Sequence, residues 1–127
     1  IKWHSLYMLL YLDNSSEERL CMPTFLVISR HSPEYCPEFN EKVRKAMLEA
    51  VGKMDGLLKK HGVKLVGAWF GSVPADHIYY MVYEAPSVEA FQKLSMEPES
   101  LAAAAHDTQE IKIVTSLEHW IEAWKKQ

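Results

Sequence analysis

Phe25-Leu-Val-Ile-Ser-Arg-His-Ser-Pro-Glu-Tyr-Cys-Pro37 is the stretch around which the rest of the chain is organised. Its first part, residues 24–29, is rich in β-forming residues and apolar on both alternating faces. That pattern is typical of a central strand that is covered on both sides. The strand leads into a loop that carries His31, Glu34 and Cys36. Structure and candidate chemistry therefore meet at one place in the sequence.

The size and composition of the chain indicate one domain. Of its 127 residues 48% are hydrophobic and 24% are charged, which suffices for a single core. Lys and Arg number 14 against 17 Asp and Glu, and no basic stripe occurs, so we expect no nucleic acid partner. Cys21 and Cys36 flank the predicted central strand and do not resemble a disulfide framework. We therefore expect a reducing compartment, the cytoplasm.

The first 21 residues are predicted to be an N-terminal extension. Their apolar run, residues 7–12, is shorter than the roughly 20 residues that span a bilayer, and it lacks the cleavage site of a signal peptide. We therefore expect no membrane partner. Met22 and Pro23 come just before the first strand, and we assign residues 22–127 to a single domain.

A long amphipathic helix is predicted to follow the opening strand. It is expected to start near Pro37 with Glu38 in its first turn, and its apolar residues recur at spacings of three and four. Three basic residues near its end suit the helix dipole, and Gly62 is of the type that ends helices in the left-handed conformation.

Two further strands are predicted for residues 63–70 and 77–83, joined by a turn at residues 71–76. Both carry apolar residues on both alternating faces. A single layer of helices covers only one face of a sheet, so the other face must meet something else, most economically the same face of a second subunit. The sequence therefore predicts a homodimer or a larger homo-oligomer.

The remaining residues complete a recognisable order of elements. Ser87 is predicted to cap a second helix, which restarts over residues 101–105, and residues 111–115 to form a fourth strand before a last helix capped by Ser116. The order strand, helix, strand, strand, helix, strand is the split βαβ pattern of the ferredoxin-like α+β fold, here with an extra C-terminal helix. Right-handed crossovers give a four-stranded antiparallel sheet of order 4-1-3-2 with helices on one face.

Four segments also carry a family resemblance. They are His31-Ser-Pro-Glu-Tyr-Cys-Pro37, His61-Gly-Val-Lys-Leu-Val-Gly67, Tyr83-Glu-Ala-Pro86 and residues 91–99. Through them the chain, over about residues 22–125, resembles the small, uncharacterised archaeal and bacterial proteins of the dimeric α/β-barrel superfamily. The resemblance implies the ferredoxin-like fold and a dimer with its sheets face to face. Because that superfamily includes monooxygenases, isomerases, haem-degrading enzymes and members without known activity, the resemblance implies no particular reaction.

The predicted topology brings reactive side chains to one end of the sheet. The first strand ends near His31, the third begins beside it at His77, and the fourth begins near Glu110. Cys36 falls at the predicted start of the long helix, whose N-terminus favours a thiolate. Asp107 lies on the approach to the fourth strand, and two imidazoles, a thiol and one or more carboxylates form a set suited to Zn²⁺ or Fe²⁺. We therefore predict a metal site made of His31, Cys36 and His77.

Four more residues are predicted to contact a small-molecule ligand. His106 and Glu110 lie on the approach to the same end of the sheet, and an aromatic-rich sheet of the kind that lines apolar pockets contributes Trp69 and Tyr80. The aromatic residues of the strands also suit a core or a dimer interface.

Simpler roles compete with the metal site. A single Cys is most often a small buried hydrophobe, and histidines at strand ends often only form hydrogen bonds. Because His-x₄-Cys is not a specific metal spacing, a metal site, a metal-free polar pocket and a purely structural cluster are all compatible with the sequence. The remaining predicted surface or capping histidines are His4, His61 and His119.

The sequence therefore predicts a small-ligand- or metal-binding protein, without indicating whether it is an enzyme. The alternative is a non-catalytic module whose sheet aromatics and C-terminal helix build an oligomer. No Gly-rich phosphate loop, nucleophile elbow or catalytic triad signature occurs in the sequence.

Overall fold

A computed structural model describes residues 22–127 of the chain. The residues Pro23–Val114 form one compact unit, and Thr115–Gln127 belong to another. His4 and Cys21, for which the sequence suggested roles, lie outside the described residues.

The first unit is built on one antiparallel sheet with the strand order β2-β3-β1-β4. In its centre β1 (Thr24–His31) pairs with β3 (Ile78–Glu84) on one side and with β4 (Asp107–Val114) on the other. β2 (Lys64–Phe70) pairs with the free side of β3. Read from the other edge, this is the predicted order 4-1-3-2. The α+β class and the four-stranded antiparallel sheet are therefore confirmed, and the order is compatible with a ferredoxin-like fold.

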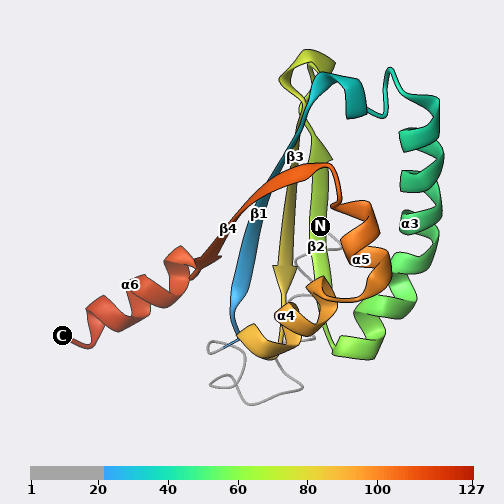
Figure 1. Cartoon of the computed structure of the whole chain (residues 1–127). Helices are drawn as coiled ribbons and strands as arrows, with labels where there is room; N and C mark the ends of the chain where they lie inside the picture. The colour runs from blue at the N-terminus through green and yellow to red at the C-terminus, as the bar shows by residue number, and fades with distance from the viewer. Residues whose placement is uncertain (1–21) are drawn as a thin grey trace, which may run out of the picture. The chain divides into compact units, whose positions relative to one another are not determined.

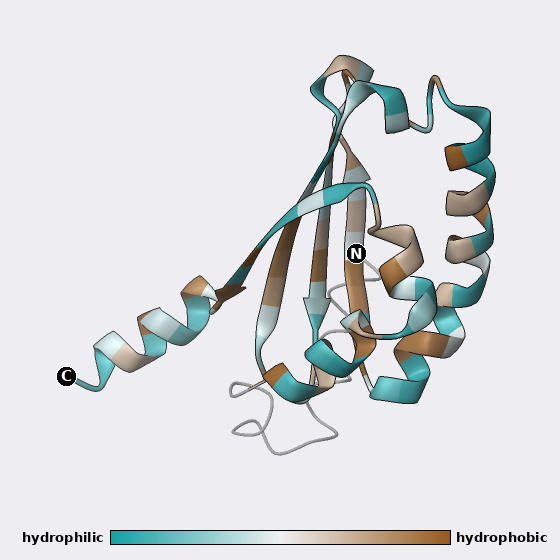
Figure 2. Ribbon diagram, viewed as in Figure 1, coloured by the Kyte–Doolittle hydropathy of each residue, from teal (hydrophilic) through white to brown (hydrophobic). Residues whose placement is uncertain are grey.

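Three helices, α3 (Glu41–His61), α4 (Val88–Ser95) and α5 (Pro98–Ala103), lie on one side of this sheet (Figure 1). Hydrophobic residues lie along the strands and on the side of α3 that is turned toward them (Figure 2). Gly62 ends α3 in the left-handed conformation, and the Ser87 hydroxyl accepts the N–H of Ala90 at the start of α4. Both predicted helix caps are confirmed.

The core lies between the sheet and α4. Phe25 and Val27 of β1 are each 2% exposed, and they pack with Phe91 and Leu94 of α4. The rings of Phe25 and Phe91 stack with their centroids 4.2 Å apart. Burial of each such side chain contributes roughly 1.5–3 kcal/mol. Alternate residues of β1 thus face the helices, while Leu26 and Ile28 point to the opposite side, which we call the open face.

The predicted start of α3 near Pro37 is wrong. The helix begins at Glu41, and the side chain of Asn40 accepts the N–H of Val43 as its N-cap. Upstream, the carbonyl of Cys36 accepts the N–H groups of both Phe39 and Asn40, which closes a separate turn. Asn40 is a better N-cap than the residues around Pro37, and this local preference decides the boundary.

Regular alternation in the sequence would put Leu65, Gly67 and Trp69 on one face of β2. That prediction is wrong, because the register shifts between Leu65 and Gly67 and leaves Val66 as an extra residue. Such a β-bulge moves the residues after it to the opposite face. Gly67 and Trp69 consequently share the open face. A Cβ on Gly67 would approach the Trp69 ring to 2.5 Å, so glycine makes room for the indole here.

The fourth strand begins four residues earlier than the predicted Ile111, at Asp107. The first half of β4 is polar, which an exposed edge strand tolerates. Because these residues lack the apolar pattern of a strand, the sequence did not indicate that β4 includes them.

The C-terminal unit contains α6 (Leu117–Lys125), which Ser116 caps as predicted by accepting the N–H of His119. Within residues 22–127 no helix is both long and apolar enough to cross a membrane.

Candidate metal centre

His31 is the last residue of β1 and lies on the helix-covered face, in the same row as Phe25, Val27 and Ser29. It is 8% exposed, and its backbone N–H donates to the carbonyl of His77 over 3.1 Å. Burial first, and then the nearby His77 ring, lower the pKa of His31, against an opposing effect of Asp107. The neutral imidazole, which is the form that binds metals, is therefore favoured.

His77 follows a short 3-10 turn, η2 (Pro74–Asp76), and has φ 53° and ψ 41°. Among residues 22–127 it is the one non-glycine residue with a positive φ. The left-handed conformation costs about 1–2 kcal/mol for a residue with a Cβ. This backbone turn brings Nδ1 of His77 to 3.3 Å from Nε2 of His31. The sequence places His77 at the start of β3, whereas the strand begins one residue later, at Ile78.

Cys36 comes from the loop after β1. It ends the 3-10 turn η1 (Pro33–Tyr35), where its N–H donates to the carbonyl of Pro33, and it is 3% exposed with a free thiol. Because α3 begins only at Glu41, Cys36 does not lie at a helix N-terminus. The expectation that the dipole of α3 favours its thiolate is therefore wrong.

These three side chains converge. One nitrogen of each histidine and Sγ of Cys36 all lie within 4.8 Å of one another. Ligand atoms on a tetrahedral zinc ion are roughly 3.5 Å apart, as follows from Zn–N and Zn–S bonds of about 2.1 and 2.3 Å. The 3.3 Å between Nδ1 of His77 and Nε2 of His31 already meets that spacing, and Sγ of Cys36 lies within 4.8 Å of a nitrogen of each histidine. The predicted grouping of His31, Cys36 and His77 is confirmed, and the group could hold a metal ion.

Tyr79 and Asp107, which are not among the three predicted metal ligands, complete the surroundings of the group. The ring of Tyr79 stacks on His31 with centroids 4.7 Å apart, and burial, together with Asp107 and Cys36, holds the pKa of Tyr79 well above its usual range. Tyr79 is therefore a neutral O–H donor. Asp107 is the cross-strand partner of His31 and accepts a 2.8 Å hydrogen bond from the Ser29 hydroxyl.

His31 also has an unmet polar atom. Its Nδ1 is buried and has no hydrogen-bond partner among the described residues. A buried donor or acceptor without a partner costs about 1–3 kcal/mol, which is unusual in a purely structural cluster.

The predicted ligand residues His106 and Glu110 lie outside this group. His106 is exposed and stacks on Tyr35 with ring centroids 3.8 Å apart. Glu110 faces Ile28 across the strands and forms ion pairs of 3.6 Å with Arg30 and 3.2 Å with Lys112. The carboxylate at the end of the sheet is instead that of Asp107, because β4 begins earlier than predicted.

Trp69 and Tyr80 are cross-strand partners in one row with Ile28 and Glu110. They are 55% and 37% exposed. Both also border the cavity between α3 and the sheet. We assign them to the open face, because alternation along the strands directs their side chains away from the helices. The structure does not bring any of the four predicted ligand residues into the His/Cys group.

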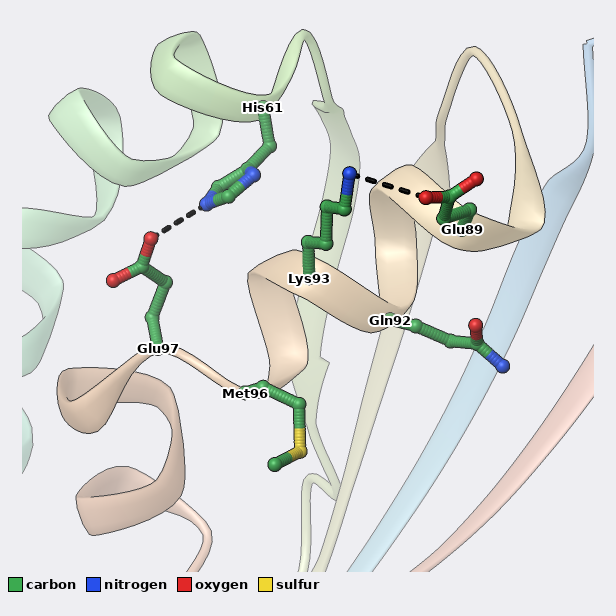
Figure 3. A pocket seen from close by; sticks show the side chains of 6 residues that line it. All are labelled: His61, Glu89, Gln92, Lys93, Met96 and Glu97. Atoms are coloured by element: carbon green, nitrogen blue, oxygen red, sulfur yellow. Dashed lines mark hydrogen bonds and ion pairs between the residues drawn. The ribbon is translucent and has the colours of Figure 1, made fainter.

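His61, which was predicted to be a surface or capping residue, is the last residue of α3. Its side chain is 13% exposed, and its Nε2 lies 2.7 Å from the Glu97 carboxylate, which also binds Lys60 over 2.7 Å. These contacts connect the end of α3 to the link between α4 and α5, beside an open hollow that Lys93 and Met96 also line (Figure 3). His119 is half-buried on α6.

Fold and site together define an α+β protein with a His/Cys/His group that could hold a metal ion. No family model matches the sequence, and no curated protein matches it. A solved structure of a protein of unknown function from Rhodopseudomonas palustris aligns with it at a TM-score of 0.48 and 12% identity, over 80% of this chain and 90% of that one. Since that protein has no assigned function, the alignment assigns none to this chain.

Proposed function

We propose that the protein binds one divalent transition metal ion through His31, Cys36 and His77. The observation that supports this is the convergence, within 4.8 Å, of ligand atoms from the end of β1, the η1 loop and the turn before β3. Two of the three side chains are buried, and a purely structural role would not need the strained backbone of His77.

Two imidazoles and a thiolate are ligands for Zn²⁺ or Fe²⁺ and not for Mg²⁺ or Ca²⁺, which prefer oxygen. Three protein ligands would leave a fourth position for water or a small molecule, as in catalytic and ligand-binding sites. A thiolate ligand also requires a reduced Cys36, which suits a reducing compartment such as the cytoplasm.

The test is metal analysis and Zn²⁺ titration of the full chain without a His tag. We expect one ion per chain, and at least a hundredfold weaker binding in His31→Ala and in Cys36→Ser. The matched control is His106→Ala, which removes an imidazole that lies outside the group. The proposal fails if the wild-type chain takes up no metal, or if His31→Ala and His106→Ala behave alike.

We further propose that the open face binds a second copy of this chain, in the face-to-face arrangement that the family resemblance implies. Its support is the exposure of Trp69 and Tyr80 beside Leu26 and Ile28, a set of large apolar side chains on the face that α3, α4 and α5 leave free.

A further inference from the structure

A cavity of about 250 Å³ lies between α3 and the helix-covered face of the sheet. Its walls are mainly apolar, with thioether and aromatic side chains that include Met47, Met54, Phe70 and Met81. An apolar cavity of roughly 150 Å³ is enough to bind benzene. The space here therefore suits a somewhat larger ring system or a short aliphatic chain.

One end of this cavity adjoins the metal group. Tyr79 and Asp107 both line the cavity, while the Tyr79 ring stacks on His31 and Asp107 pairs with His31 across the strands. A molecule in the cavity would thus have its hydrocarbon part between α3 and the sheet and one end beside the His/Cys group.

The polar groups that line the cavity determine which functional group a bound molecule can place beside the His/Cys group. They comprise the carboxylates of Glu99 and Asp107, the carboxamide of Gln109 and hydroxyl groups such as that of Tyr79. Among the described residues that line the cavity, none is Lys, Arg or His. Carboxylates repel an anion and accept hydrogen bonds from a donor, so the lining disfavours a carboxylic acid or a phosphate.

We propose that this cavity binds a small, mainly hydrocarbon molecule that carries a hydroxyl group, with the hydroxyl end between Tyr79 and Asp107. The carboxylate of Asp107 accepts the ligand O–H, and the Tyr79 O–H donates to the ligand oxygen. The inference rests on the proposed function in one respect only, namely that a metal at His31 would lie next to the bound hydroxyl.

The test uses 2-naphthol and 2-naphthoate, which share a ring system and differ in the polar end, on the metal-free full chain at pH 7. Calorimetric titration should give saturable binding of one 2-naphthol per chain, at least tenfold tighter than that of 2-naphthoate. Asp107→Asn should reduce this preference to less than threefold, because the charge that repels the carboxylate is gone.

Substitutions that fill the cavity test whether 2-naphthol binds there. Ala50→Phe places a ring in the cavity from a half-buried position of α3, whereas Ala46→Phe makes the same change at an exposed position of that helix outside the lining. We expect Ala50→Phe to abolish binding and Ala46→Phe to retain it. Ala104→Leu, which fills the cavity from the end of α5, gives a second reading should Ala50→Phe fail to fold by circular dichroism.

The outcomes separate the two proposals. Binding of 2-naphthol without any uptake of Zn²⁺ supports the cavity and refutes the metal site. Uptake of Zn²⁺ by a chain that binds no 2-naphthol overturns the cavity proposal alone. The cavity proposal is also overturned if Ala50→Phe and Ala104→Leu bind 2-naphthol as tightly as the wild type does, or if 2-naphthoate binds as tightly as 2-naphthol.

Discussion

His77 holds the chain in a left-handed conformation that glycine adopts without strain. We predict that His77→Gly is more stable than His77→Ala by about 1 kcal/mol, because alanine keeps the Cβ that is strained at this φ. Both variants should lose the metal, since neither has an imidazole. Urea unfolding of the metal-free proteins measures the difference. Equal stability of the two variants would show that the backbone at residue 77 is not strained by a Cβ.

Some residues of the site could be predicted from the sequence and others could not. His31 and His77 were predictable because antiparallel pairing puts the end of one strand beside the start of its neighbour. Tyr79 was not, because a strand tyrosine between apolar residues has the pattern of a core residue, and only the stacked ring on His31 distinguishes it. The sequence placed Asp107 at this end of the sheet, but the polar start of β4 concealed that it pairs directly with His31.

At the scale of elements, Asn40 joins α3 to the loop that carries Cys36. Its side-chain oxygen accepts the N–H of Val43, and its side-chain nitrogen donates to the carbonyl of Glu34 over 2.8 Å. Asn40→Ala should cost about 1 kcal/mol of stability, as loss of an N-cap usually does. Asn40→Asp keeps the cap and loses only the bond to Glu34.

For Asn40→Asp we therefore expect near wild-type stability together with several-fold weaker Zn²⁺ binding, because the loop of Cys36 is less well fixed. Thermal unfolding and metal titration on the same samples separate the two effects. Unchanged metal affinity in Asn40→Asp would show that the bond to Glu34 does not position the thiol.

The contact between α3 and the link from α4 to α5 predicts a dependence on pH. Hydrogen bonds from Lys60 and then from His61 lower the pKa of Glu97. A carboxylate whose folded pKa is depressed contributes stability above its unfolded pKa, and this is lost as the pH falls through the folded value. The stability gap between wild type and Glu97→Gln should therefore be larger at pH 7 than at pH 3.

Urea unfolding at pH 7, 5 and 3 measures this gap, with Glu89→Gln as the control. Glu89 forms an exposed helical pair with Lys93, and such pairs contribute only about 0.3–0.5 kcal/mol. A gap for Glu97→Gln that is independent of pH would contradict the assigned role of its charge.

At the scale of the whole molecule, the open face predicts self-association. We expect the wild-type chain to sediment as a dimer at micromolar concentration and Trp69→Lys as a monomer, because a charge would be buried in the centre of the contact. Phe39→Lys is the matched control, since Phe39 is 72% exposed and precedes α3 instead of lying on the sheet. A monomeric wild-type chain would refute the proposed dimer.

The order of elements was predictable because hydrophobic periodicity is preserved along each long element and excludes most alternatives. The first and last residues of each element were harder to predict, since a single residue with a strong local preference can move a boundary. Asn40 outcompeted Pro37 as the start of α3, and Val66 reversed the faces of β2 through one extra residue. Which of two apolar faces meets the helices is decided by packing across the sheet, and a single strand does not contain that information.

The bulge at Val66 also affects how the protein behaves at high concentration. β2 is at one edge of the sheet, and the outer N–H and C=O groups of an edge strand are a template on which another chain can add a strand. An irregular ladder is a poor template, because an added strand cannot stay in register past the extra residue. Val66 therefore acts against fibre-like growth from this edge, and a chain from which it is deleted should aggregate faster than the wild type.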